Sequence, residues 1–193
     1  MNLLDKIVDI INGRLMDGAL EEQAFQESAI YGLSYLSAPK DDSIQRPYTF
    51  DGDNVVGIEV NDIYEFSMYH RCLGMSFKEA PSFGDGNGPI TMVCDMFCVV
   101  YADRYKSGYT QEDIIMKVSA GLVGQLTPTE LGNSGIQKVK ILVQRANNNS
   151  VQVFQGEYGN EANCPFQLNT VYFGINYQIE ITAHSACLVC AEC

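Results

Sequence analysis

The last ten residues of the chain contain four possible metal ligands at even spacing: His184, Cys187, Cys190 and Cys193. Imidazole nitrogens and thiolates are the groups that bind zinc, and four of them would complete a tetrahedral site. Structural zinc sites usually combine two ligand pairs separated by a stretch of chain that wraps the ion. Here all four lie within one short terminal segment, so the pattern favours a tail with free thiols. A small cytoplasmic metal-binding or regulatory protein that uses residues 184–193 is the alternative hypothesis.

His70 and Cys72 form a second possible constellation, because side chains two positions apart on a strand share a face. A thiol beside an imidazole can act as a nucleophile when the site is exposed and the thiolate is stabilised. Nothing in the surrounding residues indicates such a setting, so we expect His70 to be a half-buried strand residue. The acidic side chains are scattered along the chain. The sequence therefore assigns no catalytic, cofactor-binding or metal-binding residue, and we do not expect an enzyme.

Two polar tracts resemble ligand loops but lack the residues that those loops require. Residues 82–89 have three alternating glycines, yet they lack the Gly-Lys-Ser/Thr ending of a phosphate loop and are followed by a strand pattern. Residues 51–54, Asp-Gly-Asp-Asn, lack the glycine and the closing acidic residue of a calcium loop. We expect an interface or hairpin loop in the first tract and a plain turn in the second.

The elements that would position these groups centre on residues 91–124. From Met92 to Ala102, alternate residues are apolar, which predicts a strand with one apolar face on which Cys94 and Cys98 are buried thiols. Thr110 can cap a helix, and Glu112 and Asp113 suit its first turn. We expect the apolar stripe of this helix to pack back on the strand.

Further elements follow from the same patterns. Residues 2–15 form an amphipathic helix that we expect to cover the sheet; the alternative is that its stripe contacts a neighbouring subunit. We expect helix in the first half of residues 19–36, with the second half undetermined, and a long surface excursion at 37–54. Strands are expected at 55–60, within 64–81, in a hairpin at 139–143 and 151–154, and at 171–183. The fold class is α+β: one domain over residues 1–193, a mainly antiparallel sheet backed by an N-terminal and a central amphipathic helix.

Charge and composition restrict the classes of function. Twelve basic and twenty-four acidic side chains give a net charge of −12, which repels a phosphate backbone and argues against a general nucleic-acid-binding protein. The N-terminal segment is interrupted by charges, and no run of about 20 apolar residues is present, so we expect neither a signal peptide nor a membrane span. Seven cysteines without a secretory signal suggest free thiols and synthesis in a cytoplasm.

The order of these elements resembles that of the tail-terminator and head-to-tail connector (neck) proteins of tailed bacteriophages. The resemblance is carried by the N-terminal helix, the strand TMVCDMFCVVYADR, the helix TQEDIIMKVSAGLVGQL, the hairpin QKVKILVQRANNNSVQVF and the final strand NTVYFGINYQIEITA. It covers most of the chain but includes no diagnostic motif. The excursion at 37–54 and the cysteine tail depart from the family pattern.

This resemblance implies a structural protein of the virion. Members of the family share an α+β fold and form homo-oligomeric rings at the head-to-tail junction, so the implied partners are copies of the same chain and neighbouring neck, portal or tail-tube proteins. No nucleic-acid specificity and no membrane association are implied. We expect the loops at 37–54 and 82–89 to contact other subunits and adjacent rings.

Overall fold

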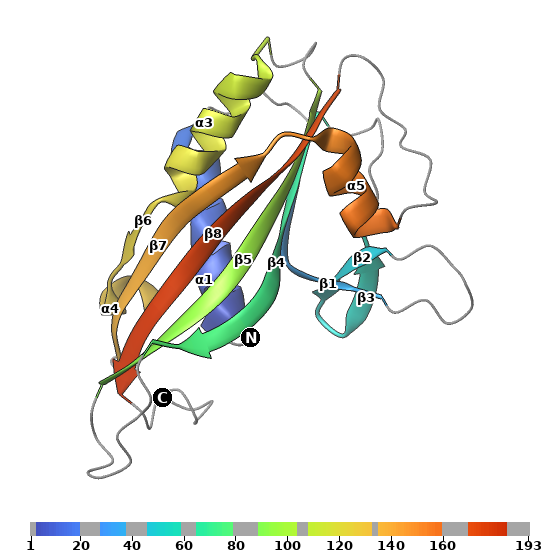
Figure 1. Ribbon diagram of the computed structural model, residues 1–193. Coiled ribbons are helices and arrows are strands. Elements are labelled where there is room, and N and C mark those ends of the chain that lie inside the picture. The colour runs from blue at the N-terminus through green and yellow to red at the C-terminus, as the bar shows by residue number, and fades with distance from the viewer. Residues whose placement is uncertain are drawn as a thin grey trace.

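An eight-stranded sheet forms the centre of the protein, as seen in the computed structural model, which describes residues 3–19, 28–37, 46–58, 65–78, 89–103, 108–132, 135–159 and 170–184 (Figure 1). The strand order is β3-β2-β1-β4-β5-β8-β7-β6, and every neighbouring pair is antiparallel except β1 and β4. The strands are β1 (Ser28–Leu36), β2 (Pro47–Asp51), β3 (Asn54–Gly57), β4 (Phe66–Phe77), β5 (Pro89–Asp103), β6 (Gly124–Leu126), β7 (Ile136–Asn147) and β8 (Thr170–His184). The α+β class and the mainly antiparallel sheet are confirmed.

Helices cover both faces of this sheet. They are α1 (Leu3–Arg14), which runs into the π-helical turn η1 (Leu15–Ala19), then α3 (Gln111–Leu122), α4 (Pro128–Leu131) and α5 (Ser150–Tyr158). One core cluster joins α1 and α3 to the sheet, and a second joins α5 to the opposite face. None of the helices within the described ranges is long and apolar enough to cross a membrane.

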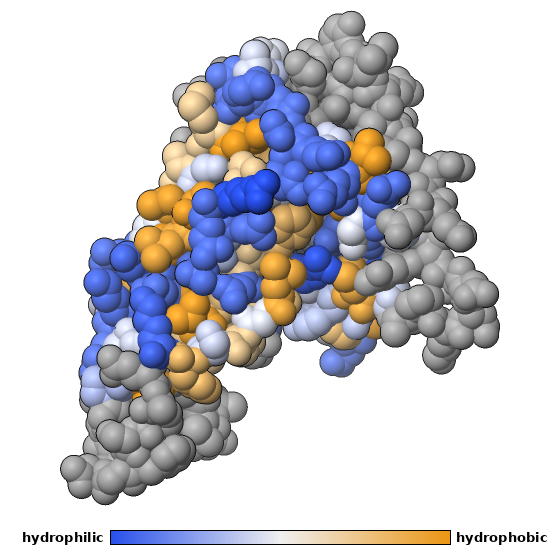
Figure 2. All heavy atoms as spheres, viewed as in Figure 1, coloured by the Kyte–Doolittle hydropathy of each residue, from blue (hydrophilic) through white to orange (hydrophobic). Residues whose placement is uncertain are grey.

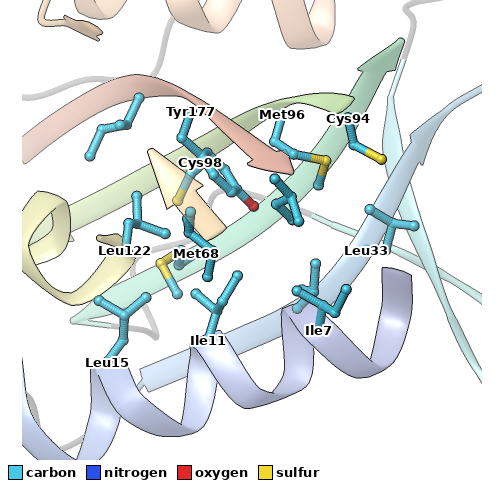
Figure 3. Close-up of a cluster of buried hydrophobic side chains, with 14 of the residues drawn as sticks. Ile7, Ile11, Leu15, Leu33, Met68, Cys94, Met96, Cys98, Leu122 and Tyr177 are labelled. Atoms are coloured by element: carbon cyan, nitrogen blue, oxygen red, sulfur yellow. The ribbon is translucent and has the colours of Figure 1, made fainter. Parts of the chain in front are cut away.

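The long strand β5 contributes to both cores because its side chains alternate between the faces. Cys94, Met96 and Cys98 belong to the cluster beneath α1 and α3 (Figure 3), whereas Val99 and Tyr101 pack beneath α5. The two thiols are free and buried, as predicted, and burial raises the pKa of Cys94 to about 12. Thus the predicted apolar face is confirmed, and part of the other face is apolar too.

Helix α3 begins where its capping residues predict. The Thr110 hydroxyl accepts a hydrogen bond from the Asp113 backbone N–H at 3.2 Å, and the Asp113 carboxylate accepts one from the Thr110 N–H at 3.0 Å. The expected apolar stripe, Ile114, Val118 and Leu122, is fully buried. The N-terminal helix is also confirmed, and its apolar face packs on the sheet rather than on a neighbour.

Two parts of the predicted layout are wrong. Residues 47–51 of the expected excursion form strand β2, hydrogen-bonded between β1 and β3. The expected return strand at 151–154 lies within helix α5, because a helix puts Val153, Phe154 and Tyr158 on one buried face, whereas a strand would separate the first two. The partners of β7 are therefore β6 and β8.

Three of the expected features lie outside the described ranges, wholly or in part. The expected helix in the first half of 19–36 lies almost entirely at residues 20–27, and the undetermined second half is strand β1. Of the tract 82–89, only Pro89 is described, at the start of β5. Cys187, Cys190 and Cys193 lie outside the description, and His184 is described only as the last backbone position of β8.

Candidate interaction surface

Exposed apolar side chains are concentrated at one end of the sheet. Of the ten large hydrophobic residues that are exposed within the described ranges, seven lie on β1–β4, and none lies on β5–β8. We call these seven the apolar edge surface: Tyr35, Phe50, Val55, Val56, Leu73, Met75 and Phe77. Their exposed fractions run from 37% to 65%, so this region is solvent-accessible despite its apolar composition.

The β2–β3 hairpin holds one half of the apolar edge surface in a rigid arrangement. Residues 51 and 54 pair across a tight turn in which Gly52 has a φ of 58°, a conformation that favours glycine. The rings of Tyr35, Tyr48 and Phe50 pack together with each pair of centroids 5.7 Å apart. The Asp-Gly-Asp-Asn tract is therefore a hairpin turn, and the aromatic cluster keeps the half-exposed Phe50 in position.

The second half of the apolar edge surface lies where β4 separates from β1. The last pair between these strands joins Ser34 to Arg71, after which β1 pairs with β2. A bulge between Cys72 and Gly74 follows, and the remainder of β4 pairs only with β5 among the described strands. Met75 lies opposite the core residue Cys94, so it continues the helix-side face of the sheet beyond the part that the helices bury.

An open pocket of about 650 Å³ lies between α1 and the β1–β3 strands. Two carboxylates, Asp5 and Asp9, line it together with aromatic rings, including those of Tyr35 and Phe50. Partial burial, and then the neighbouring Asp5, raise the pKa of Asp9. Carboxylates beside aromatic faces suit a cationic group, because the carboxylate supplies the opposite charge and the ring supplies a negative quadrupole.

His70 is fully buried and belongs to a hydrogen-bonded relay, not to a catalytic pair. The Asn12 amide nitrogen donates to the Tyr31 carbonyl at 3.2 Å, so its oxygen is left to accept from His70 Nε2–H at 2.8 Å. The other ring nitrogen, Nδ1, is then the acceptor for the Tyr177 hydroxyl at 2.9 Å. Burial lowers the pKa of His70 to about 3, so the ring is neutral at ordinary pH.

The structure does not bring His70 and Cys72 together. Both ring nitrogens of His70 are used by Asn12 and Tyr177, whereas the Cys72 thiol contacts the Gly74 carbonyl at 3.6 Å. Burial raises the pKa of Cys72, which disfavours the thiolate that a nucleophile needs. His70 is also more deeply buried than the half-buried strand residue that we expected.

A polar network holds α5 on the opposite face. Glu157, only 1% exposed, forms an ion pair with Arg71 at 2.8 Å and accepts a hydrogen bond from the Tyr69 hydroxyl at 3.1 Å. The Tyr69 and Tyr172 hydroxyls are also 3.1 Å apart. Burial raises the pKa of Glu157, although Arg71 and Tyr69 act in the opposite direction. This network was not predicted from the sequence, because Glu157 was not recognised as part of a helix.

Metal ligands do not gather within the part of the chain that the structure describes: no group of three or more His, Cys, Asp or Glu side chains there could hold an ion. The strongest candidate site is the apolar edge surface together with the acidic pocket beside it. Its residues come from α1 and four strands, and their proximity was not predicted from the sequence. Val55 and Val56, for example, are typical strand residues, and they are exposed because β3 is an edge strand of the sheet. A comparison with protein-family models finds no match, and one with curated proteins finds no significant relative.

Proposed function

We propose that this protein is a structural subunit that assembles with copies of itself into a ring at the head-to-tail junction of a tailed bacteriophage, as a tail terminator, neck or connector protein. The proposed role is mechanical and not enzymatic. The observation that carries the proposal is the apolar edge surface, because exposed apolar side chains gathered in one part of a folded protein are typical of sites that contact another protein.

The size of the surface suits a protein partner. An aromatic side chain presents about 150–250 Å² when fully exposed. Three of the seven residues are aromatic and the other four are smaller, so at 37–65% exposure the seven together leave on the order of 600 Å², shared between strands β1–β3 and the part of β4 beyond β1. This is at the upper limit for the largest patch on an ordinary monomer, about 300–600 Å². It also approaches the roughly 800 Å² that each partner contributes to a stable protein–protein interface.

Two further observations favour a virion ring over other assemblies. Of the elements that carry the resemblance to phage neck proteins, α1, β5, α3, β7 and β8 belong to one sheet with helices packed on it, whereas the return strand of the expected hairpin is helix α5. The net charge of −12 also suits a subunit near packaged DNA, because a channel wall that attracts phosphates would hinder passage of the genome.

The proposal is tested by measuring the mass of the purified full-length protein by light scattering over a concentration series, with and without a chelator. We expect a discrete closed oligomer, or a monomer that becomes one when purified portal or tail-tube protein of the same phage is added. A strict monomer that binds neither protein would overturn the proposal. If that monomer also lost its fold with the chelator, the alternative of a metal-binding tail would replace it.

A further inference from the structure

We propose that the two opposite ends of the sheet bind each other in neighbouring copies: the acidic pocket and apolar edge surface of one subunit receive the basic side chains of β7 from the next. This inference rests on the proposed self-assembly and names the contact that would make it. The occupant of the pocket is therefore a lysine or arginine side chain of a second copy of this chain.

Charge separates the two ends. Strands β1, β2 and β3 contain no lysine or arginine, and the pocket beside them is lined by Asp5 and Asp9. Strand β7 contains Lys138, Lys140 and Arg145 and no acidic residue. Because the chain as a whole is strongly acidic, a strand with only positive charges is a distinct feature of its surface. Opposite charges at the two ends attract one copy to the next and repel like ends.

The chemistry of the pocket matches the groups that β7 presents. An ammonium or guanidinium group in this space would meet carboxylates as well as the rings of Tyr35 and Phe50. Beside the charged groups, the apolar edge surface supplies area from which water is displaced on contact, and the exclusion of water strengthens the attraction between the opposite charges. Lys138 and Arg145 are both exposed, so they can reach a partner.

The position of the two ends determines the kind of assembly. Strand β3 is the first strand of the sheet and β7 is next to the last, so one copy offers the acidic end while its basic end stays available (Figure 1). Such a contact joins two different surfaces and repeats from copy to copy, so it forms a ring when the rotation closes. Lys138 and Lys140 alternate with the buried Val139 and Ile141, so they lie on the sheet face that carries α5, where Figure 2 shows hydrophilic and hydrophobic residues side by side.

Charge-altered variants test the contact in the full-length protein. The acidic-end variant combines Asp5→Asn with Asp9→Asn, and the basic-end variant combines Lys138→Gln with Arg145→Gln. We expect each variant alone to associate at least about tenfold more weakly than the unmodified protein, since two charge pairs are lost and no complementary charge is introduced. The control variants Glu112→Lys and Lys117→Glu alter charges on α3, and we expect them to assemble normally.

Mixing the two variants gives the sharper result. Each keeps one intact end, so an equimolar mixture should form a one-to-one dimer that grows no further, and a hetero-dimer peak in native mass spectrometry would identify it. This outcome does not depend on either variant assembling alone. Circular dichroism and thermal unfolding of each variant establish that its fold is retained.

The outcomes separate this inference from the proposed ring. If the unmodified protein forms a closed oligomer and both variants form it equally well, the ring stands and the contact proposed here is wrong. If association depends on both ends but yields open chains that lengthen with concentration, the contact stands and the ring is wrong. If the unmodified protein and the mixture remain monomeric at high concentration, direct contact between the two ends is refuted.

Discussion

Replacing Tyr177 by phenylalanine should destabilise the fold by removing one hydroxyl from the buried histidine relay. Tyr177 and His70 are both fully buried, and the Tyr177 hydroxyl donates to His70 Nδ1 at 2.9 Å. The substitution leaves Nδ1 without a partner in an apolar core, and an unsatisfied buried acceptor costs about 1–3 kcal/mol. Because neither residue has access to water, we expect a loss in the upper part of that range, about 2–3 kcal/mol.

Urea and thermal unfolding of the purified protein would measure this loss. For a chain of this size, 1 kcal/mol shifts the melting temperature by about 2–4 °C, so Tyr177→Phe should lower it by about 4–12 °C. The matched control is Tyr35→Phe, since Tyr35 is 37% exposed and water can replace its hydroxyl contacts. We expect the control to change stability by no more than about 0.5 kcal/mol.

A double substitution tests the physical cause. Tyr177→Phe combined with His70→Leu removes the stranded nitrogen as well as its donor, and Asn12, which is only partly buried, can turn to water. We therefore expect the double variant to be more stable than the sum of the two single losses implies, by about 1–2 kcal/mol. Strict additivity, or a Tyr177→Phe variant as stable as the unmodified protein, would refute the relay as a source of stability.

Three further predictions follow from the described contacts. Phe50→Lys should weaken self-association at least about tenfold, because a half-exposed ring of the apolar edge surface is lost. The control Val123→Lys, next to the C-terminal end of α3, should leave self-association unchanged. Sedimentation velocity measures both, and equal effects would contradict the role of the apolar edge surface in self-association. Burial lowers the pKa of His70 from 6.5 to about 3, so the stability associated with the neutral ring is fully present above about pH 6.5 and is lost as pH falls toward 3. NMR should show one imidazole signal that does not titrate between pH 5 and 8, and this signal should be absent from the spectrum of His70→Leu. Hydrogen bonds from Thr127 and Arg14 lower the pKa of Glu130 to about 2, so its contribution to the stability of the fold is present above about pH 4.5 and is lost as pH falls to 2. Glu130→Gln should flatten this part of the curve of unfolding free energy against pH. An unchanged curve would argue against the capping box at Thr127.

Much of the fold was predictable because it depends on local patterns. The alternation along β5 and β8 indicates strands with a buried face, and both lie at the centre of the sheet, where pairing on both sides reinforces that pattern. Helix α3 was predictable from Thr110 and Asp113, whose capping contacts connect residues only three positions apart. Interactions of such short range can be recognised from the order of the residues alone.

The errors arose where local patterns were ambiguous. Val151 and Phe154 have the composition of a strand, but Asn149 caps a helix by accepting from the Gln152 backbone N–H at 3.1 Å, and packing against β8 then favours that helix. Residues 47–51 look like a polar surface segment, yet β1 and β3 supply backbone partners on both sides and make them a strand. Helix α5 thus had a local signal in Asn149 that was interpreted as a turn, whereas β2 depends on tertiary partners that override a weak local preference.

By itself, then, the sequence determined the α+β class, the central strands, the capped helix and the buried thiols, because burial periodicity and capping act over a few residues. Only the tertiary structure decided where β1 leaves β4, and hence which apolar side chains stay exposed beside Asp5 and Asp9. It alone placed His70 between Asn12 and Tyr177, which are 58 and 107 positions away along the chain. Contacts at such separations depend on sheet order and register, which no short window of residues contains.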